Sequence, residues 1–166
     1  MAEMKHRQFL REKEANQLLN EISQKLNATA TELFGNPKPN VEVAETQNTK
    51  IYFINGQPVM ARRQDTFFPT LRFNTALQKL AKITVNMGAV AHICNGADLL
   101  APGIVKTEGN FKTGDYLLVI DERFQKPLAI MVALIDSDAA KGLQRGKVAK
   151  NLHYVGDTVW NVVKNL

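Results

Sequence analysis

The feature that most restricts the fold lies in the second half of the chain, where short apolar segments alternate with turn residues from residue 83 to residue 157. The apolar segments Tyr116–Asp121 and Pro127–Leu134, for example, are separated by the polar segment Glu122–Lys126. Many short strands with turn signals between them are typical of a small β-barrel or sandwich. Several of the segments are apolar on both faces, which a closed barrel capped by helices accommodates. We therefore predict a small barrel in this half.

The remaining segments of the second half are assigned from the same patterns. Ala89–Cys94 is apolar and is predicted to be a strand, whereas Asn95–Leu100 is predicted to form a one-turn helix. Asp136-Ser137-Asp138 is predicted to cap a short helix around Ala139–Leu143, because aspartate and serine are favoured at helix starts. Gly146–Tyr154 is predicted to be the last strand.

The first half combines helical and strand patterns. Leu10–Leu26 has apolar residues at helical spacing, and the breaker cluster Gly35–Asn40 follows a second helical stretch. Asn55-Gly56 is a hairpin signal between the predicted strands Lys50–Ile54 and Gln57–Arg62. These patterns predict helices packed against a small antiparallel sheet.

The pattern changes from helix to strand near Lys82–Met87. We therefore predict an α+β protein with a small α+β domain over residues 1–83 and a pseudobarrel over residues 84–166.

Composition excludes several classes of protein. The chain is 45% hydrophobic and 22% charged, which is typical of a globular protein rather than a disordered one. Its apolar stretches are far shorter than the ~20 residues that span a bilayer, and the start of the chain lacks the apolar core of a signal peptide. Cys94 is the single cysteine, so an internal disulfide is excluded. We expect a cytoplasmic protein with no membrane partner.

Signatures of enzymes and cofactors are missing from the sequence. We find no phosphate loop, dinucleotide fingerprint, Gly-x-Ser-x-Gly elbow or zinc-type His/Cys cluster. His92 lies in an apolar segment and is predicted to be a core or groove histidine. We therefore expect no catalytic residue, no cofactor and no metal.

The formal net charge is +5, and the basic residues are clustered. Lys141, Arg145, Lys147 and Lys150 fall within ten residues that include no acidic side chain. Such a cluster either is a solvated surface or attracts a polyanion, and only phosphate contacts would make binding weaken with salt.

One segment, Gly96–Val105, places two glycines around the predicted helical turn. Glycine permits close approach of another backbone, and a helix N-terminus suits a phosphate. The alternative is that Gly96 and Gly103 serve only turns.

Four blocks in this order and spacing resemble the PUA domain, a small RNA-binding pseudobarrel, over about residues 84–162. The blocks are Gly96–Val105, Gly114–Val119, Pro127–Leu134 and Gly146–Asn151. The segment Lys150–Asp157 with Trp160, and Phe68–Arg72 upstream, are similar to the malignant T-cell-amplified sequence family and its archaeal relatives. Members of that family place a pre-PUA domain before the PUA domain.

The resemblance implies a translation factor of archaeal type that binds tRNA or ribosomal RNA at the small ribosomal subunit, in initiation, re-initiation or recycling. Eukaryotic members pair with a density-regulated partner that carries a SUI-type domain, and an archaeal-type protein could lack that partner. The alternative function is a tRNA-binding accessory factor of an RNA-modification enzyme.

Residue roles are carried over from the family's glycine motif and last strand. The resemblance implies RNA-binding roles for Gly96, Ala97, Asp98, Pro102, Gly103, Lys147, Lys150 and Asn151. We add His153 or Tyr154 as residues that could stack on an unpaired base, with barrel closure as the alternative. Arg62, Arg63 and Arg72 are a secondary basic surface that could face ribosomal RNA.

Two of these assignments carry a condition. Lys147 and Lys150 point to opposite faces of a regular strand, so a bulge or a bend is needed for both to contact one RNA. Asp98 opposes an anion by its charge, and it either caps the turn or accepts a hydrogen bond from a 2′-OH or a base.

Overall fold

The structure, a computed structural model, describes residues 4–166, so residues 1–3 of the predicted first domain lie outside the described residues. The first half contains β1 (Gln8–Phe9), α1 (Glu12–Leu26), α2 (Ala30–Phe34), β2 (Val41–Thr46), β3 (Thr49–Ile54), β4 (Gln57–Arg63), β5 (Thr66–Pro69) and α3 (Asn74–Leu77). The second half contains β6 (Ala81–Val85), α4 (Met87–Ile93), β7 (Leu99–Leu100), the 3-10 turn η1 (Ala101–Gly103), β8 (Ile104–Glu108), β9 (Tyr116–Asp121), β10 (Pro127–Ala133), α5 (Ser137–Lys141), β11 (Lys147–Tyr154) and α6 (Thr158–Val163). The α+β fold class is confirmed.

The first half forms a five-stranded antiparallel sheet with the order β1-β2-β3-β4-β5. Helices α1 and α2 pack on one face of it, where Leu18, Ile22 and Leu33 meet Tyr52 and Ile54 of β3. Because side chains alternate across a strand, Ile51 and Phe53 of β3 face the other side of the sheet. The predicted helix and the Asn55-Gly56 hairpin are confirmed, and both turn residues have positive φ.

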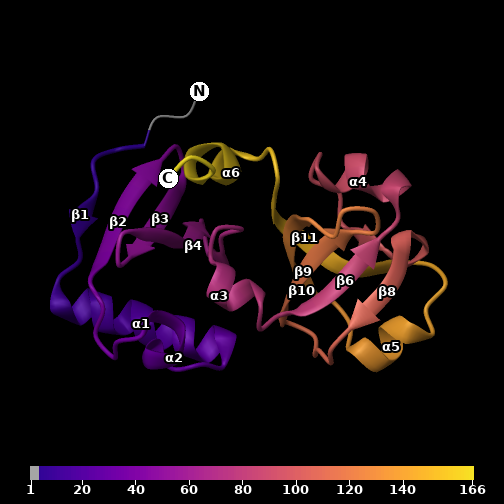
Figure 1. Ribbon diagram of the computed structural model, residues 1–166, viewed down its shortest axis with the longest axis horizontal. Helices are drawn as coiled ribbons and strands as arrows, with labels where there is room; N and C mark the ends of the chain where they lie inside the picture. Colours follow the sequence, from indigo (N-terminus) through magenta and orange to yellow (C-terminus); the bar gives the residue numbers. More distant parts are fainter. Residues whose placement is uncertain (1–3) are drawn as a thin grey trace.

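The second half forms a curled six-stranded sheet with the order β7-β11-β10-β9-β6-β8 (Figure 1). Most neighbours are antiparallel, and β6 and β9 are parallel. Apolar side chains from β6, β9, β10 and β11 fill its interior together with those of α4 and α5. The prediction of a small barrel capped by helices is confirmed.

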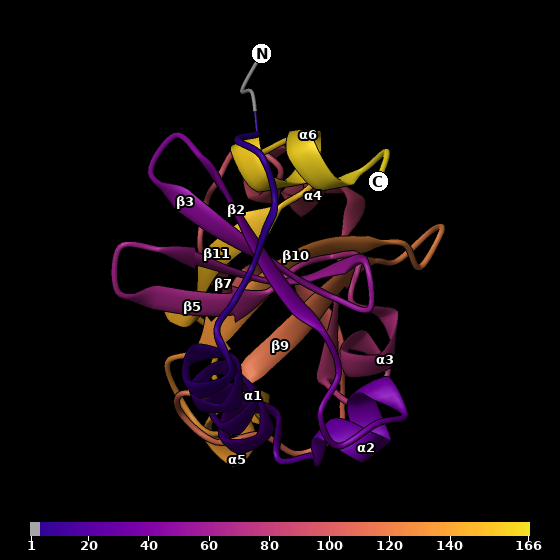
Figure 2. The ribbon, with the colours of Figure 1, turned by 90° about the vertical axis from the view of Figure 1, so that its left-hand side faces the viewer.

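The two halves share a core. Ile51, Phe53 and Phe68 of the first sheet pack in one cluster with Leu118 and Ile130 of the second. Figure 2 shows the five-stranded sheet lying across the strands of the six-stranded one. The five-stranded sheet is therefore the middle layer between α1 and α2 on one side and the pseudobarrel on the other.

Helix α6 lies against the first half although it follows the last strand of the barrel (Figure 1). Its Val159 and Val163 are buried in the shared core. The predicted boundary between residues 83 and 84 falls inside β6, which pairs with β8 and β9. The division into 1–83 and 84–166 stays a prediction.

The predicted strand at Ala89–Cys94 is wrong, because α4 occupies Met87–Ile93. Asn86 begins this helix by accepting a hydrogen bond from the Ala89 N–H at its Oδ1, 2.9 Å away. A short apolar run without polar residues at a fixed period does not distinguish a buried helix from a buried strand.

The predicted one-turn helix at Asn95–Leu100 is also wrong. The chain turns after α4 and enters β7, which pairs with β11. The short helix predicted at Ala139–Leu143 exists as α5 and begins earlier, after Asp136. The Asp136 Oδ1 accepts from the Thr113 N–H rather than from α5, and therefore fixes the preceding loop.

Candidate functional site

The site is built where the turn after α4 meets β11. Gly96 follows the helix with φ +96, a conformation that side chains rarely adopt. A Cβ placed on Gly96 would lie 3.4 Å from Cε1 and from the hydroxyl oxygen of Tyr154. Gly96 therefore packs against the half-buried Tyr154 ring, and the turn predicted for this glycine is present.

We expect Gly96→Ala to lower the free energy of unfolding by about 1–3 kcal/mol, because alanine is strained at this φ. Chemical denaturation measures the effect. Gly142→Ala is the matched control, since Gly142 has φ −97 and its added Cβ would meet nothing within 4 Å. Equal stability of the two variants would contradict the backbone argument.

Asp98 connects this turn to β11. The Lys147 Nζ lies 3.2 Å from Oδ2 of Asp98, and the Asn151 N–H donates to Oδ1 at 2.9 Å. Partial burial alone would raise the pKa of Asp98, but the Asn151 N–H and the ammonium groups of Lys147 and Lys150 outweigh it and hold that pKa below its ordinary value. Asp98 is therefore a carboxylate that orients the turn and partly neutralises the lysines.

Asn151 completes this connection. Its side-chain amide donates to the carbonyl oxygens of Ile93 at 3.1 Å and of Ala97 at 3.0 Å. Both acceptors lie at or just after the end of α4, where helix carbonyls lack intrahelical partners. Asn151 thus fixes the end of the helix and the glycine turn against β11.

A pocket of about 430 Å³ opens beside the turn, between α4 and the segment that follows it. Its lining includes Ala97, Asp98, Pro102 and Gly103, as predicted from the glycine motif, together with His92 of α4. The walls are mainly apolar, and Leu100 at the rim is 51% exposed. Of the two positions predicted for His92, core or groove, the structure has the groove position, and the ring is exposed on α4 rather than on the predicted strand.

The bulge that the two lysines require is present in β11. The pairing with β7 shifts between Lys147 and Ala149, and Val148 and Ala149 are both buried while Lys147 and Lys150 are both exposed. The two lysines and the pocket therefore lie around the same edge of the barrel, with Asp98 between them.

The proposed phosphate site at a helix N-terminus is not supported. Gly96 follows the C-terminal end of α4. At the other end of α4, the Met87 N–H donates to Oε1 of Glu122 and the Ala89 N–H donates to Asn86. These helix donors are already satisfied by protein acceptors.

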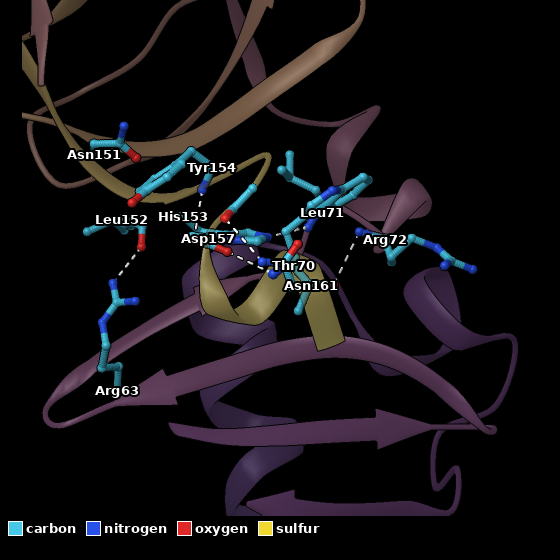
Figure 3. Close-up of polar contacts among 12 residues, drawn as sticks. Arg63, Thr70, Leu71, Arg72, Asn151, Leu152, His153, Tyr154, Asp157 and Asn161 are labelled. Carbon is cyan, nitrogen blue, oxygen red and sulfur yellow. Dashed lines mark hydrogen bonds and ion pairs between the residues drawn. The ribbon is translucent and has the colours of Figure 1, made fainter. Parts of the chain in front are cut away.

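His153 is wrong as a base-stacking residue, because its side chain is fully buried between the two halves (Figure 3). Its Nε2 accepts a hydrogen bond from the Leu71 N–H at 3.1 Å, and its Nδ1 lies 2.8 Å from Oδ2 of Asp157. Since Nε2 is an acceptor, the proton is on Nδ1 and is donated to Asp157. Tyr154, in contrast, is half-buried and stays a candidate.

The three arginines predicted as a secondary basic surface are engaged within the protein instead. Arg62 pairs with Glu21 and lies over the Phe67 ring. Arg63 donates to the Leu152 carbonyl oxygen at 2.6 Å (Figure 3). Arg72 donates to carbonyl oxygens at the end of α6. These guanidinium groups join elements of the fold, and they do not form an open cationic surface.

Within residues 4–166, no group of three or more His, Cys, Asp or Glu side chains is arranged to hold a metal ion. Over the same residues, no helix is both long and apolar enough to cross a membrane.

Comparison with protein families gives two matches that together cover most of the chain. Residues 81–155 match the PUA domain, and residues 6–79 match a domain described as "Domain of unknown function (DUF1947)". The first match contains α4, the glycine turn, the pocket and β11.

Individual relatives match both halves. An uncharacterized protein of Methanocaldococcus jannaschii is 38% identical over 125 residues, which are 75% of this chain and 77% of that protein. Translation machinery-associated protein 20 of Schizosaccharomyces pombe is 26% identical over 119 residues, which are 68% of this chain and 66% of that protein. Malignant T-cell-amplified sequence 1-A of Xenopus laevis is 25% identical over 124 residues, which are 70% of this chain and 67% of that protein. Among solved structures, a PUA-domain protein of Aeropyrum pernix is 25% identical, has a TM-score of 0.83, and matches 98% of this chain and 92% of its own.

Proposed function

We propose that this chain, which belongs to the family of PUA-domain proteins with an N-terminal pre-PUA domain, is a non-enzymatic RNA-binding translation factor. The family includes the malignant T-cell-amplified sequence proteins and archaeal relatives. In this proposal, the protein contacts tRNA and the small ribosomal subunit. PUA domains are RNA-binding modules. The relatives named for the translation machinery favour this role over other uses of bound RNA.

One observation carries the proposal for the site: the open pocket beside the glycine turn adjoins the two exposed lysines of β11. A volume of about 430 Å³ is within the usual range for small-ligand pockets, and its apolar walls suit the face of a base. The ammonium groups of Lys147 and Lys150 suit phosphates, which position an RNA without specifying its sequence. In this proposal, the RNA strand lies against the small residues of the glycine turn and pocket, and the Tyr154 ring lies under the turn. These small residues are Gly96, Ala97, Pro102 and Gly103.

We expect the double variant Lys147→Glu/Lys150→Glu to bind deacylated tRNA about ten- to a hundredfold more weakly than the wild type. Filter binding across a salt series measures this, and the slope of log affinity against log salt should decrease in magnitude by about 1–2 because two phosphate contacts are lost. Lys13→Glu/Lys38→Glu makes the same change in net charge on exposed residues of the first half and is the matched control. Equal weakening in both double variants would mean that only net charge matters, and the proposed site would be wrong.

Lys150→Glu alone separates binding from folding, because Lys147 forms the ion pair with Asp98 at 3.2 Å whereas Lys150 acts on that carboxylate only from a longer distance. A sucrose gradient of cell lysate tests the cellular role. Migration with the small subunit supports the translation factor, and a SUI-type partner would be detected in the same fractions. Recovery with an RNA-modification enzyme instead would favour the accessory-factor alternative.

A further inference from the structure

The turn between β9 and β10 presents an aromatic side chain to solvent. Phe124 is 62% exposed, although a phenylalanine gains stability when it is buried. The guanidinium carbon of Arg123 lies 5.9 Å from the centre of the Phe124 ring, and Nζ of Lys126 lies 6.0 Å from it. Proteins that bind single-stranded nucleic acids combine exposed aromatic rings, on which bases stack, with nearby cations that contact the phosphates. The Phe124 turn has both features.

The turn is held in this conformation by the buried Asp121. Its Oδ1 accepts from the N–H groups of Arg123 and Phe124, and its Oδ2 accepts from the Lys126 N–H at 3.0 Å. These bonds, that of Phe124 first, hold the pKa of Asp121 below its ordinary value, so the carboxylate is charged near neutral pH. The ring is therefore presented on an ordered turn, which reduces the entropy lost when a ligand binds.

The same turn is tied to α4. The Glu122 N–H donates to the Val85 carbonyl oxygen at 3.0 Å, and the Glu122 carboxylate accepts from the Met87 N–H at 3.1 Å. Figure 1 shows β6 and β9 ending beside α4. The acidic side chain on this turn is thus bonded to the helix, and Arg123 and Lys126 are the charges that flank the ring.

Helix α4 joins the turn to the pocket. Its seven residues span about 10 Å, which is the length of about three stacked nucleotides. The N-terminal end of α4 carries the Phe124 turn, and its C-terminal end carries the connection of Asn151 to Ile93 and Ala97. One strand of a few nucleotides could therefore contact both ends.

We propose that Phe124 is a base-stacking residue for an unpaired nucleotide of the RNA strand that occupies the pocket, with Arg123 and Lys126 beside its flanking phosphates. The inference rests on the proposed function of the pocket. It extends the RNA-binding surface along α4 to a turn that holds none of the site residues implied by the resemblance.

The test uses the full chain and single-stranded RNA oligonucleotides of two and of eight nucleotides, with an RNA duplex lacking unpaired ends for comparison. Phe124→Ala should bind the eight-nucleotide strand about five- to a hundredfold more weakly, because a stacking contact is lost, and should bind the duplex like the wild type. Phe9→Ala is the matched control, since Phe9 is also exposed, at 70%, and lies in β1 of the first half.

Phe124→Trp gives a direct readout. Trp160 is the only tryptophan of the chain, so quenching beyond that of the wild type on addition of the eight-nucleotide strand reports stacking at residue 124. The two-nucleotide strand, which is too short to span α4, should bind Phe124→Ala and the wild type with similar affinity.

The outcomes separate the two proposals. If Phe124→Ala keeps the affinity of the wild type while Lys147→Glu/Lys150→Glu loses it, the stacking role is wrong and the proposed function stands. If the wild type binds neither these RNAs nor deacylated tRNA, both proposals are wrong. If Phe124→Ala binds RNA normally but no longer migrates with the small subunit, the ring contacts a protein and the nucleotide assignment is overturned.

Discussion

Asp157→Asn is expected to lower the free energy of unfolding by about 2–4 kcal/mol, although it replaces one atom. The carboxylate of Asp157 accepts from the His153 ring, from the Tyr154 N–H at 3.0 Å and from the Trp160 N–H at 2.7 Å. His153 in turn accepts from Leu71, which fixes its tautomer. Either orientation of an asparagine amide would direct donors at donors, and at least one buried N–H would lose its acceptor.

Urea denaturation measures this difference, and Asp138→Asn on the exposed side of α5 is the matched control. A loss for Asp157→Asn no larger than that of the control would show that the buried hydrogen bonds contribute little.

The pH dependence of the same comparison has a definite sign. Burial alone would raise the pKa of Asp157, but the His153 ring and the N–H groups of Trp160 and Tyr154 outweigh it and lower that pKa. A carboxyl whose pKa is lowered by folding stabilises the protein above its unfolded value of about 3.9, and that stability disappears as the pH falls through the folded value. The gap between wild type and Asp157→Asn should therefore be constant near neutral pH and shrink below about pH 4. A gap that widens in acid would contradict the assignment.

Arg72→Ala is expected to release α6 from the first half and to cost about 1.5–3 kcal/mol. The Arg72 guanidinium donates to the carbonyl oxygens of Val163 at 2.8 Å and of Lys164 at 2.9 Å, and also to that of Leu166. These carbonyls lie at the end of α6, where helix acceptors lack intrahelical partners. Lysine keeps the charge but lacks the planar fork, so Arg72→Lys should recover only part of the loss.

Trp160 lies within α6 and is the natural reporter, since the chain has a single tryptophan. Its emission should shift to longer wavelength in Arg72→Ala at denaturant concentrations that leave the wild type folded. Arg145→Ala, on an exposed loop residue, should leave both emission and stability unchanged. An unshifted Trp160 spectrum in Arg72→Ala would show that the apolar contacts of α6 hold it without the arginine.

The elements of the first half could be predicted because their signals are local. The apolar spacing of α1 and the Asn55-Gly56 turn are each contained in a short window of sequence. Helix α4 was missed because a seven-residue apolar helix has too few residues to establish a period. Its start depends on the Asn86 side chain, which is a weaker signal than the apolar run that follows.

The resemblance named the candidate site residues, but the hydrogen bonds that connect them could not be predicted from the sequence. Asp98 and Lys147 meet only because β7 pairs with β11 across 49 residues of chain. The errors have the same origin. In the sequence, His153 and the three arginines have no evident partners. The packing of one half on the other buries His153 and engages Arg63 and Arg72, whereas Arg62 is engaged within the first half by Glu21 and the Phe67 ring.

The position of α6 has a consequence for biosynthesis. Ile51 and Phe68 are translated well before Val159 and Val163, which pack in the same cluster. Domains usually fold in the order in which they emerge. Here the nascent first half keeps part of its apolar surface uncovered until α6 has been synthesised, so polypeptides that stall before α6 should be more prone to aggregate than those that contain it.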